Sequence, residues 1–104
     1  MTSLKVGEVK VLLCKDGRAI SNVKPVYIGL LGMCLKSNFQ EIHKHEHVDV
    51  QIYLQKPHQR KHCSLKAVVT QLSGAIAGLT FLDTKVKEYN ELRDIVAARQ
   101  SMHH

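Results

Sequence analysis

The segment "LKAVVTQLSGAIAGLTFLD" (residues 65–83) carries the clearest information about the fold. Residues 65–72 are apolar on both faces of an extended chain, as expected of a central strand. Ser73-Gly74 then supplies turn-forming residues, and residues 75–83 resume a period-2 alternation. The small residues within 75–83 predict a bend or a close approach of two backbones. The segment therefore predicts two antiparallel strands.

Four further strands are expected before this pair. The segment "HVDVQIYLQ" (47–55) alternates strictly and directs its valine, isoleucine and leucine side chains inward. Asp16-Gly17 is a strong hairpin signal after a short apolar strand, and Pro25 predicts an edge position because proline lacks a backbone N–H. The four expected strands are residues 9–14, 19–28, 33–36 and 47–55.

The end of the chain has the pattern of a helix. Asp83 or Thr84 is expected to cap it, and the helix is expected over about 84–98. An apolar stripe at helical spacing predicts the face that packs on the sheet. The residues of that stripe are Val86, Tyr89, Leu92, Ile95 and Val96. We therefore predict one mainly β domain over residues 1–104, a small six-stranded antiparallel β-barrel (about 5–83) with a C-terminal amphipathic helix.

Composition narrows the class of protein. The chain is 44% hydrophobic and 23% charged, which is ordinary for a globular protein, and its apolar runs fall well short of the roughly 20 residues of a membrane-spanning helix. Its three cysteines form no C-x-x-C pair, and no secretory signal pattern is present at the start. These features predict a cytoplasmic protein. Scattered carboxylates and the lack of a nucleophile–base arrangement predict no enzyme activity and no cofactor.

The formal net charge is +6, and much of the excess lies within residues 55–66. Lys56, Arg60 and Lys61 form a basic stretch there, which favours an anionic partner such as nucleic acid or an acidic protein. A small basic β-barrel is typical of single-strand nucleic-acid binders, which stack bases on aromatic side chains. The aromatic residues left for this role, Tyr53 among them, are not interleaved with the basic stretch, so this function is kept as an alternative.

The segment "HKHEH" (43–47) brings three histidines to alternate positions. In an extended chain, His43, His45 and His47 would point to one face and form candidate metal ligands. No second ligand pair at zinc spacing accompanies them, so we predict an exposed loop and no metal.

The order of these patterns resembles the PilZ domain, a bacterial family that typically senses cyclic di-GMP. The resemblance covers roughly residues 5–97 and rests on the apolar strand that ends in Gly32, on "VDVQIYL", and on "GLTFLDTKVKEYNELRDIV" as the last strand and helix. It implies a β-barrel followed by a helix.

The two nucleotide-binding motifs of that family are missing. The family's D/N-x-S-x-x-G motif would align with residues 27–32, where Tyr27 replaces the acidic or amide residue, Gly29 replaces the serine, and only Gly32 matches. The earliest arginine, Arg18, follows the first strand, so the family's upstream R-x-x-x-R pair is absent. The resemblance therefore implies that cyclic di-GMP does not bind in the usual mode.

We therefore predict an adaptor that acts through a protein partner, as the resemblance implies for members without these motifs, some of which serve type IV pilus biogenesis or motility regulation. The candidate partner loop comprises Tyr27, Gly29, Leu30, Leu31, Gly32 and Met33, and the candidate basic surface comprises Arg18, Lys56, Arg60 and Lys61. Three alternatives remain: Leu30 and Leu31 only close the barrel end, the loop forms a homo-oligomer, or Arg18 and Arg60 help to bind cyclic di-GMP at a non-standard site.

Overall fold

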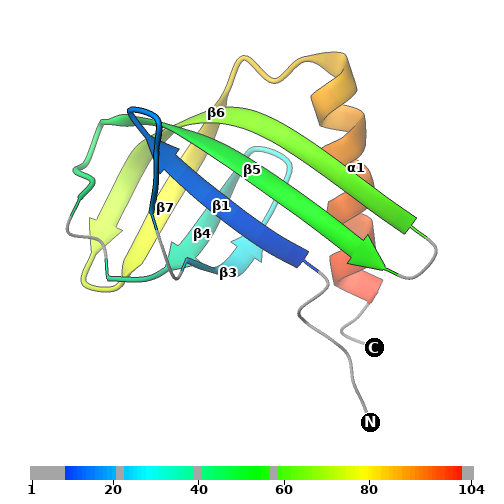
Figure 1. The fold of residues 1–104 in the computed structure, drawn as a ribbon, viewed down its shortest axis with the longest axis horizontal. Helices are drawn as coiled ribbons and strands as arrows, with labels where there is room; N and C mark the ends of the chain where they lie inside the picture. The colour runs from blue at the N-terminus through cyan, green and yellow to red at the C-terminus, as the bar shows by residue number, and fades with distance from the viewer. Residues whose placement is uncertain (1–8, 21–22, 39–40, 57–58, 102–104) are drawn as a thin grey trace, which may run out of the picture.

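The computed structural model describes residues 9–20, 23–38, 41–56 and 59–101. Within these residues the chain forms an antiparallel sheet of seven strands followed by one helix (Figure 1). The elements are β1 (Val9–Lys15), β2 (Arg18–Ile20), β3 (Lys24–Ile28), β4 (Gly32–Lys36), β5 (His47–Lys56), β6 (Gln59–Ser73), β7 (Ile76–Leu82) and α1 (Val86–Ser101).

The strands lie in the order β2-β1-β5-β6-β7-β4-β3. In Figure 1, β1, β5 and β6 pass in front of β7, β4 and β3, so the sheet curls back on itself, and β1 comes close to β3. Among the described residues no strand pairing joins the two edge strands, β2 and β3. The mainly β fold with a C-terminal helix is confirmed, whereas closure into a barrel is not.

The prediction of six strands was wrong by one. The single strand expected over 19–28 is divided into β2 and β3, which lie at opposite edges of the sheet. Ser21 and Asn22, which lie outside the described residues, belong to residue types common in turns. The prediction relied on the spacing of apolar residues alone and did not take these two residues into account. Pro25 lies in the edge strand β3, as predicted, beside an irregularity in the pairing of β3 with β4.

The strand β6 organises the curl of the sheet. It pairs with β5 over residues 59–68 and with β7 over residues 66–73, so the two pairings overlap at residues 66–68. The pairing with β7 shifts between Val69 and Gln71, opposite Gly78, where an added Cβ would lie 3.2 Å from the Cβ of Gln71. The small residue Gly78 therefore lies opposite an irregularity of β6, whereas the bend or close backbone approach expected within 75–83 stays a prediction.

Alternating residues of the strands meet α1 in one core. The inward positions of β5 are all buried, as predicted, and Leu92 and Ile95 of α1 are fully buried against the sheet. The thiol of Cys63 in β6 lies 3.4 Å from the carbonyl oxygen of Glu88, to which it donates, and this contact ties the helix to the sheet. No polar or charged side chain of the described residues is buried.

The helix departs from its prediction in two respects. It runs from Val86 to Ser101, later than the expected span of 84–98. The stripe also included residues that do not enter the core, because Val86 is 78% exposed and Tyr89 is 39% exposed. The apolar arc of the helix is wider than the arc that the sheet covers. No helix among the described residues is long and apolar enough to cross a membrane.

Candidate protein-docking groove

The connection between β3 and β4 is a tight loop with a fixed backbone. The N–H of Gly29 donates to the carbonyl oxygen of Gly32 over 2.9 Å, and the N–H of Phe81 donates to the carbonyl oxygen of Leu31 over 2.9 Å. A Cβ added at Gly32 would collide with the carbonyl oxygen of Leu79. Glycine is therefore required at position 32 because the loop lies directly against the backbone of β7.

The loop side chains divide between the core and the surface. Leu30 is half-buried against the core, while Leu31 is 82% exposed. Met33 is 3% exposed, so its predicted place on the exposed loop is wrong: it points inward beside Leu79, its partner in β7. The burial of Leu30 fits the alternative in which these two leucines only close the end of the curled sheet. The exposure of Leu31 does not fit it. Core packing therefore accounts for the position of Leu30 and not for that of Leu31.

Tyr27 lies over the loop. Its side chain is 61% exposed, and its hydroxyl oxygen would lie 2.5 Å from a Cβ added at Gly29. The absence of a side chain at Gly29 therefore leaves room for the tyrosine ring. Tyr27 and Gly29 therefore fit one another, because the ring takes the space that a side chain at position 29 would need.

The loop forms one wall of a surface groove of about 1120 Å³. The opposite wall comes from α1, with Tyr89, Arg93 and Val96, and backbone and side chains of β6 and β7 also line the groove. Among the described lining residues Arg93 carries the only charge, and it makes no ion pair with another described residue. The groove is thus apolar with a single cation on its helical wall.

Exposed large hydrophobic side chains concentrate at this groove. Half of those among the described residues, Tyr27, Leu31 and Tyr89, line it. The remaining ones are Val26, which neighbours Tyr27, and Ile76 and Val86. Tyr89, Arg93 and Val96 were not predicted as site residues, because helical spacing alone assigned the apolar ones to the core.

The predicted basic surface is divided. Arg18 lies in the β1–β2 hairpin opposite Lys15, whereas Arg60 pairs with Gln55. Asp49, the β5 partner of Cys14, and Gln55 are six positions apart (55 minus 49), about 20 Å at roughly 3.3 Å per residue. Arg18 therefore lies away from Arg60.

The other two members of that surface also differ. Lys61 points toward α1, where its Nζ lies 3.5 Å from a carboxylate oxygen of Asp94. The side chain of Lys56 lies outside what the structure describes. Arg60 is exposed. The four residues therefore do not form one surface in the described part of the chain.

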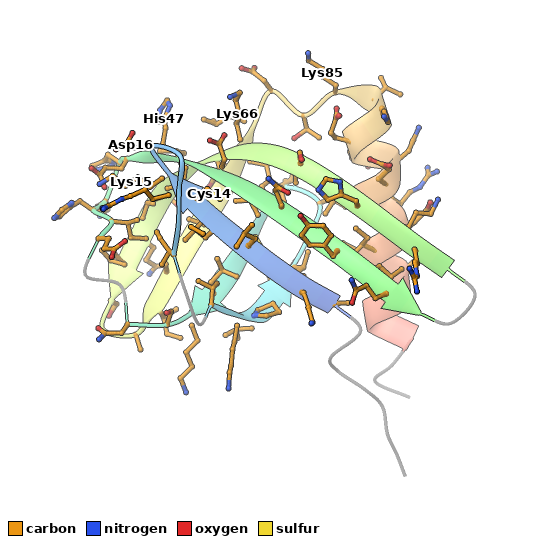
Figure 2. The ribbon with its side chains drawn as sticks, in the orientation of Figure 1. Cys14, Lys15, Asp16, His47, Lys66 and Lys85 are labelled. Carbon is orange, nitrogen blue, oxygen red and sulfur yellow. The ribbon has the colours of Figure 1, made fainter. Side chains whose placement is uncertain are left out.

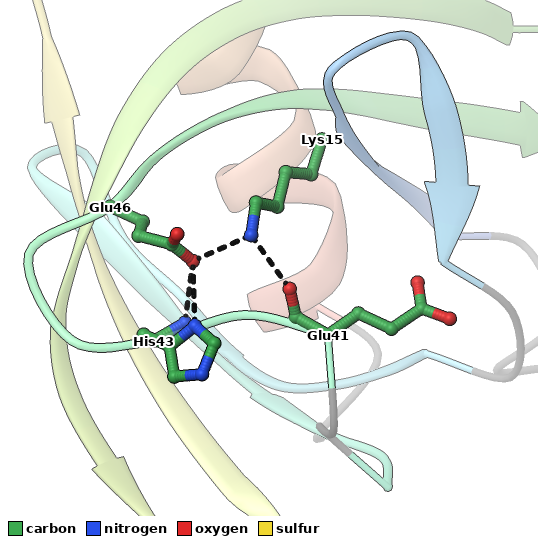
Figure 3. A network of polar contacts seen from close by, with 4 residues as sticks. All are labelled: Lys15, Glu41, His43 and Glu46. Carbon is green, nitrogen blue, oxygen red and sulfur yellow. Dashed lines mark hydrogen bonds and ion pairs between the residues drawn. The ribbon is translucent and has the colours of Figure 1, made fainter.

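The histidine segment is an exposed turn that leads into β5, as predicted, so its side chains do not have the extended backbone that a shared face would require. The N–H of Glu46 donates to the carbonyl oxygen of His43 over 3.2 Å, and His45 has a φ of 77°. The Glu46 carboxylate accepts from the His43 N–H over 2.7 Å and from Lys15 Nζ over 2.9 Å (Figure 3). Lys15 also donates to the Glu41 carbonyl oxygen over 2.9 Å. This network joins β1 to the segment before β5.

No group of three or more histidine, cysteine or acidic side chains among the described residues could hold a metal ion. Burial, together with the nearby carboxylates of Glu91 and Glu88, raises the pKa of the Cys63 thiol to about 12. That thiol is therefore protonated at neutral pH and unsuited to nucleophilic attack.

A second pocket, of about 680 Å³, lies between the β1–β2 hairpin and the segment before α1. Cys14, Lys66 and Lys85 are among its lining residues, and all three are labelled in Figure 2. Charges of both signs line it, including Lys66 and Asp49, whose side chains are 3.6 Å apart. Its exposed, mutually neutralised charges make it a weaker candidate than the apolar groove.

No protein-family model matches the chain, and no curated protein matches it. Among solved structures, the crystal structure of an uncharacterized protein of Legionella is similar to it. The TM-score is 0.61 with 17% sequence identity, and the match covers 95% of this chain and 92% of that chain. At this identity the likeness is one of fold, and it extends over the sheet and the helix together.

Proposed function

We propose that this chain is a PilZ-like adaptor domain that docks a protein partner in the groove between the β3–β4 loop and α1, and that does not bind cyclic di-GMP in the usual mode. The observation that carries the proposal is the 82% exposure of Leu31 on a loop whose backbone is fixed by hydrogen bonds. One exposed leucine would be ordinary, but Leu31 lines the groove together with the exposed side chains of Tyr27 and Tyr89, and an exposed apolar patch is typical of a contact surface.

The chemistry of the groove indicates the kind of partner. Tyr27, Leu31 and Tyr89 offer two aromatic rings and one aliphatic side chain, which are common anchors of protein interfaces. Arg93 adds a cation that no described residue neutralises. An apolar protein segment that carries a carboxylate matches both features, since the carboxylate would pair with the guanidinium group.

Several features argue against the usual nucleotide mode. Tyr27 covers the place of the motif's serine side chain, and Arg93 is the only charged residue among the described residues that line the groove. Arg18 and Arg60, which could have supplied guanidinium groups, do not line it. A cyclic dinucleotide carries two phosphates, so this groove offers it little charge compensation.

The experiment compares two aspartate substitutions at exposed apolar positions. The immobilised chain, its Leu31→Asp variant and its Ile76→Asp variant are exposed to extract of the source cells, and retained proteins are identified by mass spectrometry. Ile76 is exposed and lies outside the groove, so it controls for the added charge and the reduced apolar surface. A protein retained by the wild type is then purified, and its dissociation constant is measured for each variant.

We expect Leu31→Asp to weaken that binding at least tenfold and Ile76→Asp to leave it unchanged. Arg93→Gln is expected to weaken it less and to reduce its dependence on salt. Equal binding by the wild type and Leu31→Asp would contradict the proposal. A concentration-dependent mass that Leu31→Asp abolishes would instead identify a second copy of the chain as the occupant.

A further inference from the structure

The outer face of β5 and β6 carries a pair of stacked rings. Tyr53 and His62 are direct partners in the pairing of these strands, with ring centroids 4.6 Å apart and an interplanar angle of 13°. Tyr53 is half-buried and His62 is exposed. One face of the imidazole covers the phenol ring, and β7 does not extend along this part of β6, because its pairing begins only at Lys66. The other face of the imidazole is therefore not covered by a neighbouring strand.

One amide oxygen fixes both rings. Gln51 Oε1 accepts a hydrogen bond from the Tyr53 hydroxyl over 2.6 Å, and Nε2 of His62 lies 3.1 Å from the same oxygen. Since a glutamine oxygen can only accept, Nε2 carries the proton. Rings whose orientations are fixed in this way lose little conformational freedom when another planar group stacks on them.

Cations flank the stacked pair. Lys10 in β1 is the partner of Tyr53, and Arg60 lies two residues before His62, hence on the same face of β6. Both are exposed, and neither forms an ion pair with another described residue. The pairing of β5 with β6 thus interleaves an aromatic residue with the basic segment, although the two are separate along the chain.

We propose that this outer face binds single-stranded nucleic acid by stacking a base on His62, while Lys10 and Arg60 contact the flanking phosphates. Imidazole and phenol rings are common stacking partners of unpaired bases, and a stack tolerates any base because every base has a planar face. The net charge of +6 would draw the strand to the protein. The site is separate from the apolar groove, because none of its residues lines that groove.

A structural role alone would make the ring pair a cross-strand contact that stabilises the hairpin. A binding site makes a different prediction: replacing the exposed ring of His62 weakens nucleic-acid binding even in a variant that remains folded. The probe is a fluorescein-labelled ten-nucleotide oligouridylate, titrated with the full chain by fluorescence anisotropy at about 50 and 200 mM salt. His62→Ala, His62→Phe and the double variant Lys10→Gln/Arg60→Gln are compared with the wild type.

The control is the double variant Lys24→Gln/Lys36→Gln. It removes the same charge from two exposed lysines that face one another across β3 and β4, away from the stacked rings. We expect His62→Ala to weaken binding about tenfold and His62→Phe to retain it, because phenylalanine restores a ring. The Lys10→Gln/Arg60→Gln variant should reduce the slope of log affinity against log salt by about 1.4, about 0.7 for each phosphate that is no longer neutralised, and the control should not.

Three results would overturn the proposal: no binding at 50 mM salt, wild-type affinity in His62→Ala, or an equal loss in the control variant. A titration with uridine monophosphate tests whether the site binds a nucleic-acid strand or a free nucleotide. We expect the ten-nucleotide probe to bind at least tenfold more tightly, and equal affinity for the monophosphate would assign the site to a free nucleotide instead of a strand. Leu31→Asp should leave the affinity for the oligonucleotide unchanged, so that failure of this proposal and failure of the groove proposal remain separate results.

Discussion

Replacing Gly32 by alanine should destabilise the fold, whereas the same change at Gly29 should not. At Gly32 the new methyl group meets the carbonyl oxygen of Leu79, so the backbone of the loop or of β7 must move. At Gly29 the methyl group meets the ring of Tyr27, which can rotate away because it is 61% exposed. Neither glycine has a positive φ, so steric contact and not backbone conformation separates the two variants.

The expected size follows from these contacts. Overpacking costs about 1–3 kcal/mol, and replacing glycine by alanine returns about 0.4–1 kcal/mol by restricting the unfolded chain. The middles of these two ranges leave a fall in the free energy of unfolding of about 1–2 kcal/mol for Gly32→Ala, whereas Gly29→Ala should change it by less than about 1 kcal/mol. At about 4–8 °C per kcal/mol, the melting temperature of Gly32→Ala should drop by roughly 5–15 °C.

Urea denaturation followed by circular dichroism measures both free energies, and thermal melts check the order. Gly32→Ala that is as stable as the wild type would refute the close contact between the loop and β7. A large loss in Gly29→Ala with little change in Gly32→Ala would refute the assignment of the two glycines. In either case the fixed loop that holds Leu31 outward would lose its physical basis.

Three further results are expected. A thiol reagent at pH 8 should modify at most two of the three cysteines in the folded protein and all three in guanidinium chloride, because the buried Cys63 thiol has a pKa of about 12. The hydrogen bond from Lys15, with that from a backbone N–H, lowers the pKa of Glu46 below its ordinary value of 4.5, so its contribution to stability exists above that pH and is lost as the pH falls through the folded-state pKa. The difference in melting temperature between the wild type and Lys15→Met should thus be constant near neutrality and shrink in acid, and a pH-independent difference would contradict this. Leu92→Ala should cost about 2–5 kcal/mol in urea denaturation and Val86→Ala less than about 0.5 kcal/mol, since the first side chain is fully buried and the second is 78% exposed, and similar losses would contradict the helix orientation.

The sequence predicted the elements whose residues have one clear period. The alternation in β5 identified its four buried positions, and the Asp16-Gly17 turn follows from residues able to adopt positive φ, at 53° and 80°. The division of the strand expected over 19–28 was not predicted, because the chain continues in an apolar pattern after the break while its two halves pair at opposite edges of the sheet. Only the pairing of β2 with β1 and of β3 with β4 shows that this segment is two strands and not one.

The site was predicted on one side only. The resemblance led us to predict a partner loop over Tyr27 to Met33, which stays a prediction, but it could not say that Leu30 turns inward while Leu31 turns outward. The helical wall was missed because Tyr89 matches the period of the core stripe. The sheet covers only part of the apolar face of the helix, so some of its apolar residues stay exposed. Only the placement of the helix on β6 reveals which residues these are.

We propose that the loop between β3 and β4 presents an apolar docking surface in the place where the resembled family holds its nucleotide. The most direct test is a titration of cyclic di-GMP into isotope-labelled protein at near-physiological salt, with the amide signals of residues 27–32 as the readout. We expect no change in these signals at millimolar ligand, because among the described residues the groove offers one cation, and Tyr27 lies over Gly29. Signals in this loop that shift and saturate at micromolar ligand would contradict it and would assign the groove to a nucleotide.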